Sequence, residues 1–493
     1  MNAIISMKNS TSKTHQPNRK SKNRAKLQNI LDNAESYSEW KAAAKAYDDD
    51  AGGTQWRNIE ESTLYDFTEI RQRLDQLRLH RKEGDDLALL FALNEGIHGN
   101  MGGMGKSILY HRSKLGTKYL IEQYVDEIVE SLQHIAQLNK KIISPEEKRD
   151  FFHRANLCCG RSALMLSGGG SLGHFHLGVL KALMEENLVP SVLSGASAGA
   201  FVSAIFGTRN KKDMLTYLNS EELYAASEAE ASWINRLFRE GKSDRYGIEQ
   251  VEHSINELIP NLTFQEAYAL SGYRINISVA PAEEHQTSRL LNAITSPNVY
   301  VRDAVKASCA IPGVYPAVTL NAKNVKGESQ PYLPSRKWVD GSISDDLPAK
   351  RLSRLYGVNH YIGSLINPIV MYANDDSIDR GIAGKIARKV SHKSVSGWAR
   401  NMQSLTQKYG KNWPRLKMFS SMANSIFSQH YEADIAVFPD FKNFNLSKIT
   451  SPLTASELMD LVQQGERATW ANMDMIRTSS KISRAIEDIL IEL

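Results

Sequence analysis

Apolar residues recur at three- and four-residue spacing from about residue 27 to about residue 156, and this spacing predicts amphipathic helices. Leu120, Tyr124 and Ile128, for example, fall on one face of such a helix. The sequence Ser-Pro-Glu-Glu at 144–147 is typical of a helix start, because serine caps the helix and proline fits its first turn. We therefore predict an all-helical N-terminal domain over residues 27–156.

The pattern changes at Arg161. Short apolar runs of strand length then alternate with helical stretches such as "HFHLGVLKALMEENL"; the runs include "SALMLS", "PSVLSG", "RINISVA", "KWVD", "HYIGSLI" and "ADIAVF". Strands that alternate with helices form βαβ units, which place parallel strands in one sheet and helices on its faces. We predict an α/β domain with a mostly parallel sheet over residues 161–366.

The N-terminal stretch before the helices, residues 1–26, is polar and basic and lacks apolar periodicity. Its acid-free composition also fits an organelle transit peptide, but we favour a disordered basic tail. It has no apolar core of a secretory signal, and no apolar run of the chain approaches the ~18 residues of a membrane-spanning helix. We expect a cytoplasmic protein that has no transmembrane helix and contacts membranes only peripherally.

Residues 367–493 are predicted to be a basic, amphipathic helical region that completes the α/β fold, with a capping box from Thr454 to Glu457. Between residues 380 and 431 there are ten lysines and arginines and no acid, interleaved with Ile, Val, Trp, Met and Phe. This composition fits a helix on an anionic lipid surface. It equally fits ordinary helices that cover the sheet with a basic outer face. No recognition motif accompanies the charge, so we expect no nucleic-acid partner.

Composition excludes several other classes. Of the 493 residues, 42% are hydrophobic and 23% are charged, which is ordinary for a globular protein, and the net charge of +5 is small for this length. The cysteines Cys158, Cys159 and Cys309 have neither the number of a disulfide framework nor the spacing of metal ligands. We expect reduced thiols, no metal ion and no cofactor.

A glycine-rich loop follows the first predicted strand in "LMLSGGGSLGHFHLGVL" and leads into a helix. Glycines let the backbone approach a ligand, and N–H groups at a helix start favour negative charge. The spacing Gly168-x-Gly170-x-x-Gly173 also fits a dinucleotide-binding loop, but that site requires an acidic residue at the end of the next strand. Here the next strand ends in Ser197 instead, so we interpret the loop as a site for a developing oxyanion.

The second strand runs into Gly195-Ala196-Ser197-Ala198-Gly199 and then a helix. A G-x-S-x-G sequence between strand and helix is typical of a nucleophile elbow, in which small neighbours permit a sharp turn. Acyl transfer requires such a hydroxyl together with N–H donors aimed at the oxyanion. The loop and the elbow lie at the carboxyl ends of successive strands, where open α/β sheets bind ligands. We predict that Ser197 is a nucleophile.

A serine nucleophile requires a base, and histidine is the usual one. None of the candidate histidines has an evident triad context, and we interpret them as structural: His174, His176, His253, His285 and His360. A partly desolvated carboxylate can replace histidine, because burial raises its pKa. In "KWVDGSISDDLP", Asp340 ends a predicted strand before Gly341. By its residues alone it also fits an ordinary turn aspartate.

Four segments resemble the patatin-like phospholipase family in their order and approximate spacing: the glycine loop 168–173, the elbow 195–199, "ASCAIPGVYP" at 307–316 and "VDGSISDDLP" at 339–348. The resemblance covers about residues 161–366. It implies a patatin-like sheet flanked by helices and a Ser–Asp dyad, with Ser197 as nucleophile and Asp340 as general base. It also implies an oxyanion hole formed by the loop residues Gly168, Gly169, Gly170, Ser171 and Gly173.

One position of the resemblance departs from the family pattern. The family has Asp-Gly-Gly or Asp-Gly-Ala at the catalytic aspartate, and here Ser342 takes the third place. Serine is small, so we expect the turn to be kept.

The segment "EWKAAAKAYDDDAGGTQWR" and the helices after it resemble the domain of unknown function that precedes patatin domains in intracellular triacylglycerol lipases. The resemblance implies hydrolysis of acylglycerols, with triacylglycerol as the substrate, at a membrane or lipid-droplet surface. The alternatives are a phospholipase A or a lysophospholipid acyltransferase, and a non-catalytic lipid-surface binding protein. The pair His80-x-x-x-x-Asp85 fits a loose acyltransferase pattern, but its charged surroundings favour a solvated helix surface.

Overall fold

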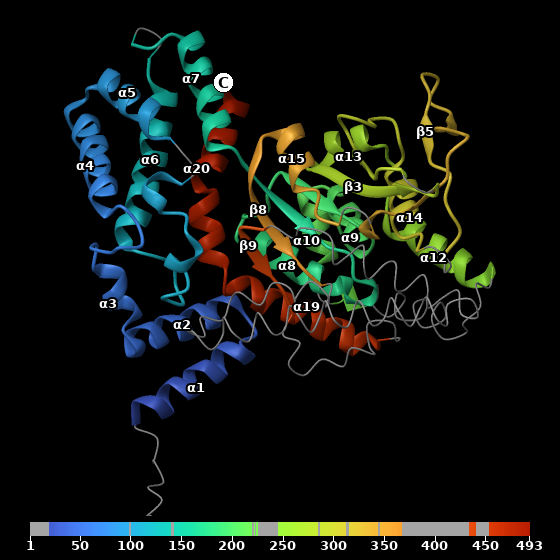
Figure 1. The fold of residues 1–493 in the computed structure, drawn as a ribbon, viewed down its shortest axis with the longest axis horizontal. Coiled ribbons are helices and arrows are strands. Elements are labelled where there is room, and N and C mark those ends of the chain that lie inside the picture. The colour runs from blue at the N-terminus through green and yellow to red at the C-terminus, as the bar shows by residue number, and fades with distance from the viewer. Residues whose placement is uncertain are drawn as a thin grey trace, which may run out of the picture.

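The structure of the chain, a computed structural model, describes residues 19–97, 100–139, 142–218, 221, 223–224, 245–283, 286–311, 315–343, 346–366, 433–439 and 453–493. Residues 1–18 and the basic segment 380–431 lie outside these ranges. Helices of the N-terminal part form a bundle beside a sheet that has helices packed against it (Figure 1). None of the helices in the described ranges combines the length and apolarity that crossing a bilayer requires.

The N-terminal part is helical, as predicted. Its helices are α1 (Arg19–Asn33), α2 (Tyr37–Ala51), α3 (Gly53–Asn58), α4 (Phe67–Glu83), α5 (Asp86–Gly96), α6 (Tyr119–Gln137) and α7 (Pro145–Cys159). The predicted serine cap is present at the start of α7 and forms a capping box, in which Ser144 accepts from the Glu147 N–H and Glu147 accepts from the Ser144 N–H.

Helix α1 corrects one prediction. It begins at Arg19, inside the stretch for which we predicted a disordered tail, so residues 19–26 are helical. Arg24 forms an ion pair with Asp50 of α2 at 2.8 Å, and Leu31 is buried against the rest of the protein. These tertiary partners stabilise a helix whose own sequence is too polar to show apolar periodicity.

The central sheet is mostly parallel. Among the described residues, seven strands form it in the order β4-β3-β2-β1-β8-β9, with β7 also paired to β3. The strands are β1 (Arg161–Leu166), β2 (Val192–Gly195), β3 (Arg274–Pro281), β4 (Arg289–Asn292), β7 (Trp338–Asp340), β8 (Val358–Ser364) and β9 (Ile435–Val437). Of these seven described strands, only β4 and β7 run antiparallel to their neighbour β3. Strands β5 (Asn321–Lys323) and β6 (Ser329–Pro331) form a separate hairpin.

The register of β1 and β2 positions the site. Leu166 at the end of β1 pairs with Gly195 at the end of β2, so the loops that follow both strands leave the sheet at the same edge. Helix α8 (His174–Glu185) follows the first loop and helix α9 (Ala198–Gly207) follows the second. The described residues of this part also form the helices α10 (Lys211–Tyr217), α12 (Arg245–Leu258), α13 (Phe264–Ser271), α14 (Val301–Ser308) and α15 (Ala349–Tyr356).

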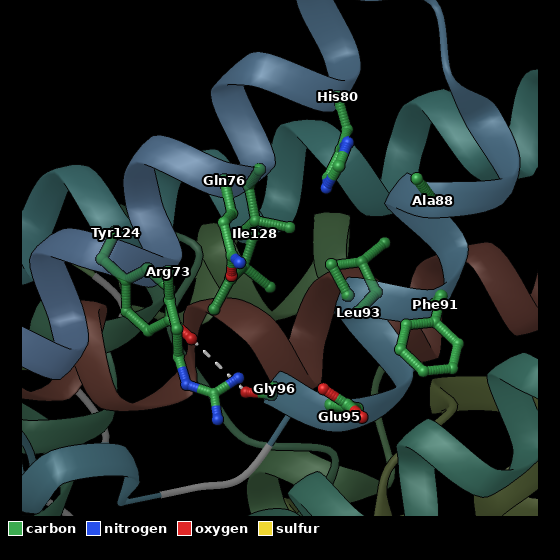
Figure 2. A pocket seen from close by; sticks show the side chains of 12 residues that line it. Arg73, Gln76, His80, Ala88, Phe91, Leu93, Glu95, Gly96, Tyr124 and Ile128 are labelled. Carbon is green, nitrogen blue, oxygen red and sulfur yellow. Dashed lines mark hydrogen bonds between the residues drawn. The ribbon is translucent and has the colours of Figure 1, made fainter.

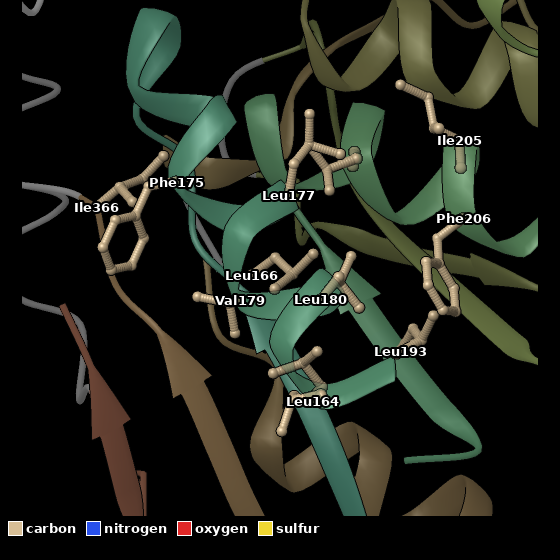
Figure 3. Close-up of a cluster of buried hydrophobic side chains, with 14 of the residues drawn as sticks. Leu164, Leu166, Phe175, Leu177, Val179, Leu180, Leu193, Ile205, Phe206 and Ile366 are labelled. Atoms are coloured by element: carbon tan, nitrogen blue, oxygen red, sulfur yellow. The ribbon is translucent and has the colours of Figure 1, made fainter. Parts of the chain in front are cut away.

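The core beneath this edge is apolar. Leu164 and Leu166 of β1 belong to one buried cluster with Leu177 and Leu180 of α8, and Phe206 of α9 lies in the same cluster (Figure 3). Burial of each such side chain contributes about 1.5–3 kcal/mol to folding. The cluster fixes α8 and α9 against the strands from which the two loops emerge.

In the described residues 433–439 and 453–493, the C-terminal region contributes two helices and a strand. Helix α19 (Ala455–Trp470) begins with the predicted capping box at Thr454 and packs closely along α8. A Cβ on Gly178 of α8 would lie 1.9 Å from the Val462 carbonyl oxygen, so the two helix backbones meet at glycine. Strand β9 adds to the edge of the sheet beside β8.

The last helix, α20 (Met473–Glu492), joins the two parts of the molecule. It lies between the N-terminal helices and the sheet (Figure 1), in contact with α6, α7 and β1. Ile482, Ile486 and Ile489 belong to the buried cluster of the N-terminal helices. Residues more than 300 positions apart in sequence therefore share one core.

Candidate active site

Ser197 occupies a strained turn between β2 and α9. Its backbone angles are φ 51° and ψ −119°, and positive φ is rare for residues other than glycine. Such a conformation costs about 1–3 kcal/mol and persists where the surroundings enforce it. The turn is the sharp strand-to-helix connection predicted from the G-x-S-x-G sequence.

The glycines of the elbow are required by close backbone contacts. A Cβ on Gly195 would lie 2.2 Å from the Gly199 carbonyl oxygen, and a Cβ on Gly199 would lie 2.1 Å from the Leu166 carbonyl oxygen. Ala196 is fully buried, and Ala198 packs against Gly173 of the glycine loop. Small residues therefore allow the elbow to fold onto the end of β1.

Two neighbours that the sequence did not single out hold the backbone of Ser197. Ser308, at the end of α14, accepts a hydrogen bond from the Ser197 N–H at 2.9 Å. The Cys309 thiol donates a hydrogen bond to the Ser197 carbonyl oxygen, with Sγ 3.5 Å from that oxygen. Both residues belong to the segment "ASCAIPGVYP", which carried the family resemblance without suggesting a role for either.

Asp340 lies beside Ser197 at the end of β7. It pairs with Val279 of β3, its side chain is buried, and it lies close enough to the Ser197 side chain for Ser197 to lower its pKa. Burial raises the pKa of Asp340 from 3.8 to about 6, and hydrogen bonds from Ser342 and Ser197 act in the opposite direction. A carboxylate with this pKa can accept a proton from the serine at neutral pH.

The turn after Asp340 survives the departure from the family pattern. Residues Gly341–Ile343 form a 3₁₀ turn, and a Cβ on Gly341 would lie 2.3 Å from the backbone of Ser278. The Ser342 N–H donates to Asp340 Oδ1 at 2.8 Å, and the Ser342 side chain helps to lower the pKa of this carboxyl. The turn therefore keeps a backbone donor on Asp340.

The glycine loop passes directly beside the nucleophile. A Cβ on Gly168 would lie 2.9 Å from Ser342 Cβ and 3.4 Å from Ser197 Cβ. The Gly168 N–H, however, donates to Oδ1 of the buried Asp346 at 2.7 Å. The Gly168 N–H, which was predicted as an oxyanion donor, is therefore already paired with a side-chain acceptor in this structure.

The next positions of the loop have N–H groups that remain available. Within the described part of the chain, the N–H groups of Gly169 and Gly170 have no protein acceptor. Gly170 has φ 58° and begins a 3₁₀ helix that runs through Ser171 to Gly173. Gly173 allows the close packing against Ala198, where a Cβ would approach within 3.3 Å. Gly169 and Gly170 are thus the candidates for oxyanion donors.

The structure shows the surroundings of four of the five candidate histidines. His176 is buried between Ser167 and Ser364, and His360 Nδ1 lies 2.9 Å from Ser162 Oγ. His253 is exposed on α12 and pairs with Glu257 at 3.2 Å. His174 is buried at the start of α8, and His285 lies outside the described residues.

A separate cavity lies in the N-terminal helices. It has a volume of about 420 Å³ and is lined by α4, α5 and α6, with His80, Arg73, Phe91 and Tyr124 on its walls (Figure 2). Asp85 caps α5 by accepting the Ala88 N–H at 3.0 Å. The two polar residues of the acyltransferase pattern therefore have different surroundings: His80 lines the cavity, and Asp85 caps the start of α5. Across the described ranges, no group of histidines, cysteines and acids could hold a metal ion.

Two family models match the chain. Residues 17–157 match a domain of unknown function (DUF3336), and residues 164–352 match the patatin-like phospholipase model. The second match contains the glycine loop, Ser197 and Asp340.

Several curated proteins are similar over most of the chain. Triacylglycerol lipase SDP1L of Arabidopsis thaliana is 30% identical, over 93% of this chain and 58% of its own length. Triacylglycerol lipase 4 of Saccharomyces cerevisiae is 32% identical, over 90% of this chain and 50% of its own length. Triacylglycerol lipase ptl3 of Schizosaccharomyces pombe is 32% identical, over 94% of this chain and 96% of its own length. The chain thus spans about half the length of the first two relatives and nearly all of the third.

Proposed function

The chain belongs to the patatin-like phospholipase family, and we propose that it is a carboxylic ester hydrolase that cleaves acylglycerols through Ser197 and Asp340. The observation that carries this proposal is the position of the buried Asp340 carboxylate beside Ser197, which occupies a strained turn at positive φ. A strained serine beside a buried base is typical of a nucleophile and not of a structural hydroxyl.

In the proposed acylation step, Asp340 takes the proton of the Ser197 hydroxyl while the serine oxygen attacks the ester carbonyl carbon. The carbonyl oxygen becomes negatively charged, and the N–H groups of Gly169 and Gly170 donate to it. The tetrahedral intermediate then collapses. The ester bond breaks, the leaving alkoxide takes the proton from Asp340, and an acyl-serine remains.

Deacylation repeats these roles with water. Asp340 accepts a proton from water, whose oxygen attacks the acyl carbon, and the same N–H groups stabilise the second oxyanion. When this intermediate collapses, the serine oxygen takes the proton back from Asp340 and the fatty acid leaves. The step requires no metal ion or cofactor, because the buried carboxylate carries each proton in turn.

The substrate class rests on the relatives, three of which are named triacylglycerol lipases. We infer that the substrate is triacylglycerol and that the protein meets it at a membrane or lipid-droplet surface. The chain is cytoplasmic and peripheral under this proposal, with the basic segment 380–431 as a candidate contact with anionic lipid.

The test combines labelling with turnover. A fluorophosphonate probe is expected to label the full chain and not Ser197→Ala, because only the wild-type serine can attack phosphorus. Triolein, diolein and phosphatidylcholine emulsions are then compared, and fatty acid release is expected to be fastest from triolein. Turnover that persists in Ser197→Ala would overturn the nucleophile, and preference for phosphatidylcholine would replace the acylglycerol substrate by a phospholipid. Labelling without turnover of any lipid would contradict the lipase function.

A further inference from the structure

The peptide between Ser167 and Gly168 is held from both ends by buried side chains. The Ser167 carbonyl oxygen accepts a hydrogen bond from His176 Nε2 at 2.9 Å, and the Gly168 N–H donates to Asp346 Oδ1 at 2.7 Å. His176 and Asp346 are 0% and 1% exposed, respectively. Both come from elements outside the loop, since His176 lies on α8 and Asp346 precedes α15.

The chemistry of His176 fixes its role in this arrangement. A carbonyl oxygen can only accept, so Nε2 carries the proton, and Nδ1 accepts from Ser364 Oγ at 2.7 Å. Burial lowers the pKa of His176 to about 4, so the ring is neutral at physiological pH. A neutral imidazole with both nitrogens occupied has a single orientation, and it presents one N–H to Ser167.

The same network also fixes the following peptide. Ser167 Oγ accepts the Ile366 N–H at 2.9 Å and donates to the Gly168 carbonyl oxygen at 3.2 Å. A trans peptide is planar, and its C=O and N–H point in opposite directions. Holding the Gly168 carbonyl therefore sets the direction of the Gly169 N–H, the first candidate donor to the oxyanion.

We propose that His176 and Asp346 are positioning residues, which clamp the Ser167–Gly168 peptide so that the Gly169 N–H is aimed at the oxyanion. This inference rests on the proposed hydrolase function and identifies the side chains that hold the glycine loop rigid. Neither His176 nor Asp346 contacts the substrate under this proposal.

The loop requires such a clamp because its own sequence provides no stiffness. Three consecutive glycines, residues 168–170, have access to more backbone conformations than any other residues. One oxyanion donor is worth about 10²–10³ in rate, and a displacement of about 1 Å can cost about 10²-fold. An unclamped loop would spend most of its time with the Gly169 N–H away from the position where charge develops.

The test removes each contact and then restores it. His176→Leu keeps an apolar volume without the donor, whereas His176→Gln keeps an N–H that can reach Ser167. Asp346→Ala removes the acceptor, whereas Asp346→Asn keeps an oxygen for the Gly168 N–H. We expect kcat on a soluble short-chain ester to fall about 10–100-fold in His176→Leu and Asp346→Ala, with KM changed less than threefold, and to recover partly in the two conservative variants.

A pair of inhibitors separates positioning from general damage. A trifluoromethyl ketone analogue forms an oxyanion on attack by Ser197, and an ether analogue of the substrate does not. If the oxyanion donor is misaligned, the affinity for the ketone is expected to fall by the same factor as kcat, and the affinity for the ether is expected to stay unchanged. Equal weakening of both inhibitors, or unchanged kcat in folded His176→Leu and Asp346→Ala, would overturn the proposal.

Matched controls come from polar residues away from the loop. His360→Leu removes a partly buried histidine on β8 that contacts Ser162 on β1. Asp48→Ala removes a buried carboxylate that accepts the backbone N–H groups of Lys114 and Leu115. Both are expected to lower stability and to keep the wild-type kcat of the folded fraction.

Two further arms keep the outcome decisive. If His176→Leu does not fold, Ser364→Ala removes only the hydrogen bond that orients the ring, and a smaller loss of kcat with the same inhibitor pattern is expected. Wild-type protein that shows neither fluorophosphonate labelling nor ester turnover would instead refute the hydrolase function itself. That result differs from one in which the wild type is active and the clamp variants are unaffected.

Discussion

The hydroxyl of Ser308 ties the turn at Ser197 to the central sheet. It accepts the Ser197 N–H at 2.9 Å and donates to the Ser278 carbonyl oxygen on β3 at 2.8 Å. Ser308 is fully buried at the end of α14, so neither bond is replaced by solvent. One side chain thus satisfies the backbone of a residue at positive φ and fixes it relative to the strand that pairs with β7.

Ser308→Ala is expected to lower both stability and activity. The Ser197 N–H and the Ser278 carbonyl would lose their buried partner, which costs about 1–3 kcal/mol. We expect kcat to fall about tenfold because the elbow becomes less rigid. Thermal unfolding and ester turnover measure the two effects.

Ser203→Ala is the matched control. Ser203 is equally buried, on α9 directly after the elbow, and its hydroxyl has no hydrogen-bond partner among the described residues. Its removal is expected to leave kcat unchanged and stability equal or higher. A similar loss of kcat in both variants would show that general packing, and not the Ser308 contacts, supports the elbow.

The sequence predicted the two residues at the centre of the site for different reasons. Ser197 was identified from local features, because the five consecutive residues of a G-x-S-x-G sequence are enough to indicate the turn. Asp340 required the family resemblance, since its place beside Ser197 depends on β7 pairing antiparallel with β3. Ser308 and Asp346 were not predicted, because a serine or aspartate acquires a backbone partner only through tertiary contacts.

Activity is expected to depend on pH through Asp340. The base must be ionised to accept the serine proton, and burial raises the pKa of this carboxyl to about 6. kcat/KM should therefore rise from low pH with a midpoint near 6 and stay level through pH 8. A soluble ester avoids changes in the lipid interface. A midpoint near the ordinary 3.8 would show that Asp340 is not buried as described, and full activity at pH 4 would remove it as the base.

Asp340→Asn is expected to abolish activity and to stabilise the protein. The raised pKa means that the folded state binds a proton more tightly than the unfolded state, so wild-type stability falls as pH rises from about 4 through about 6. At about 1.4 kcal/mol per pKa unit, the difference between 3.8 and about 6 bounds the cost at about 3 kcal/mol. The amide carries no charge to bury.

Chemical denaturation at pH 4.5 and pH 8 measures this effect. We expect Asp340→Asn to exceed the wild type in stability at pH 8 and to differ little at pH 4.5, where the wild-type carboxyl is protonated. A variant that is less stable at pH 8 would indicate that weakened interactions with Ser342 and Ser197 outweigh the removal of the buried charge.

The packing of the last helix was harder to predict from the sequence than the residues of the site. The amphipathic pattern of residues 473–492 predicts a helix but does not say which partner its apolar face contacts. In the structure that face enters the core of the N-terminal helices, from which it is separated by the whole α/β region. Long-range packing of this kind depends on shape and not on local periodicity.

Ile486→Ala tests whether the last helix stabilises the N-terminal part. Ile486 is 0% exposed within the N-terminal cluster, whereas Ile491 on the same helix is 84% exposed. Truncating the buried side chain is expected to cost about 2–5 kcal/mol, and Ile491→Ala should stay within about 0.5 kcal/mol of the wild type. Hydrogen exchange of α6 and α7 is expected to rise in Ile486→Ala and not in Ile491→Ala, because those helices contact α20. Equal exchange in the two variants would mean that the N-terminal helices are stable without the C-terminal helix.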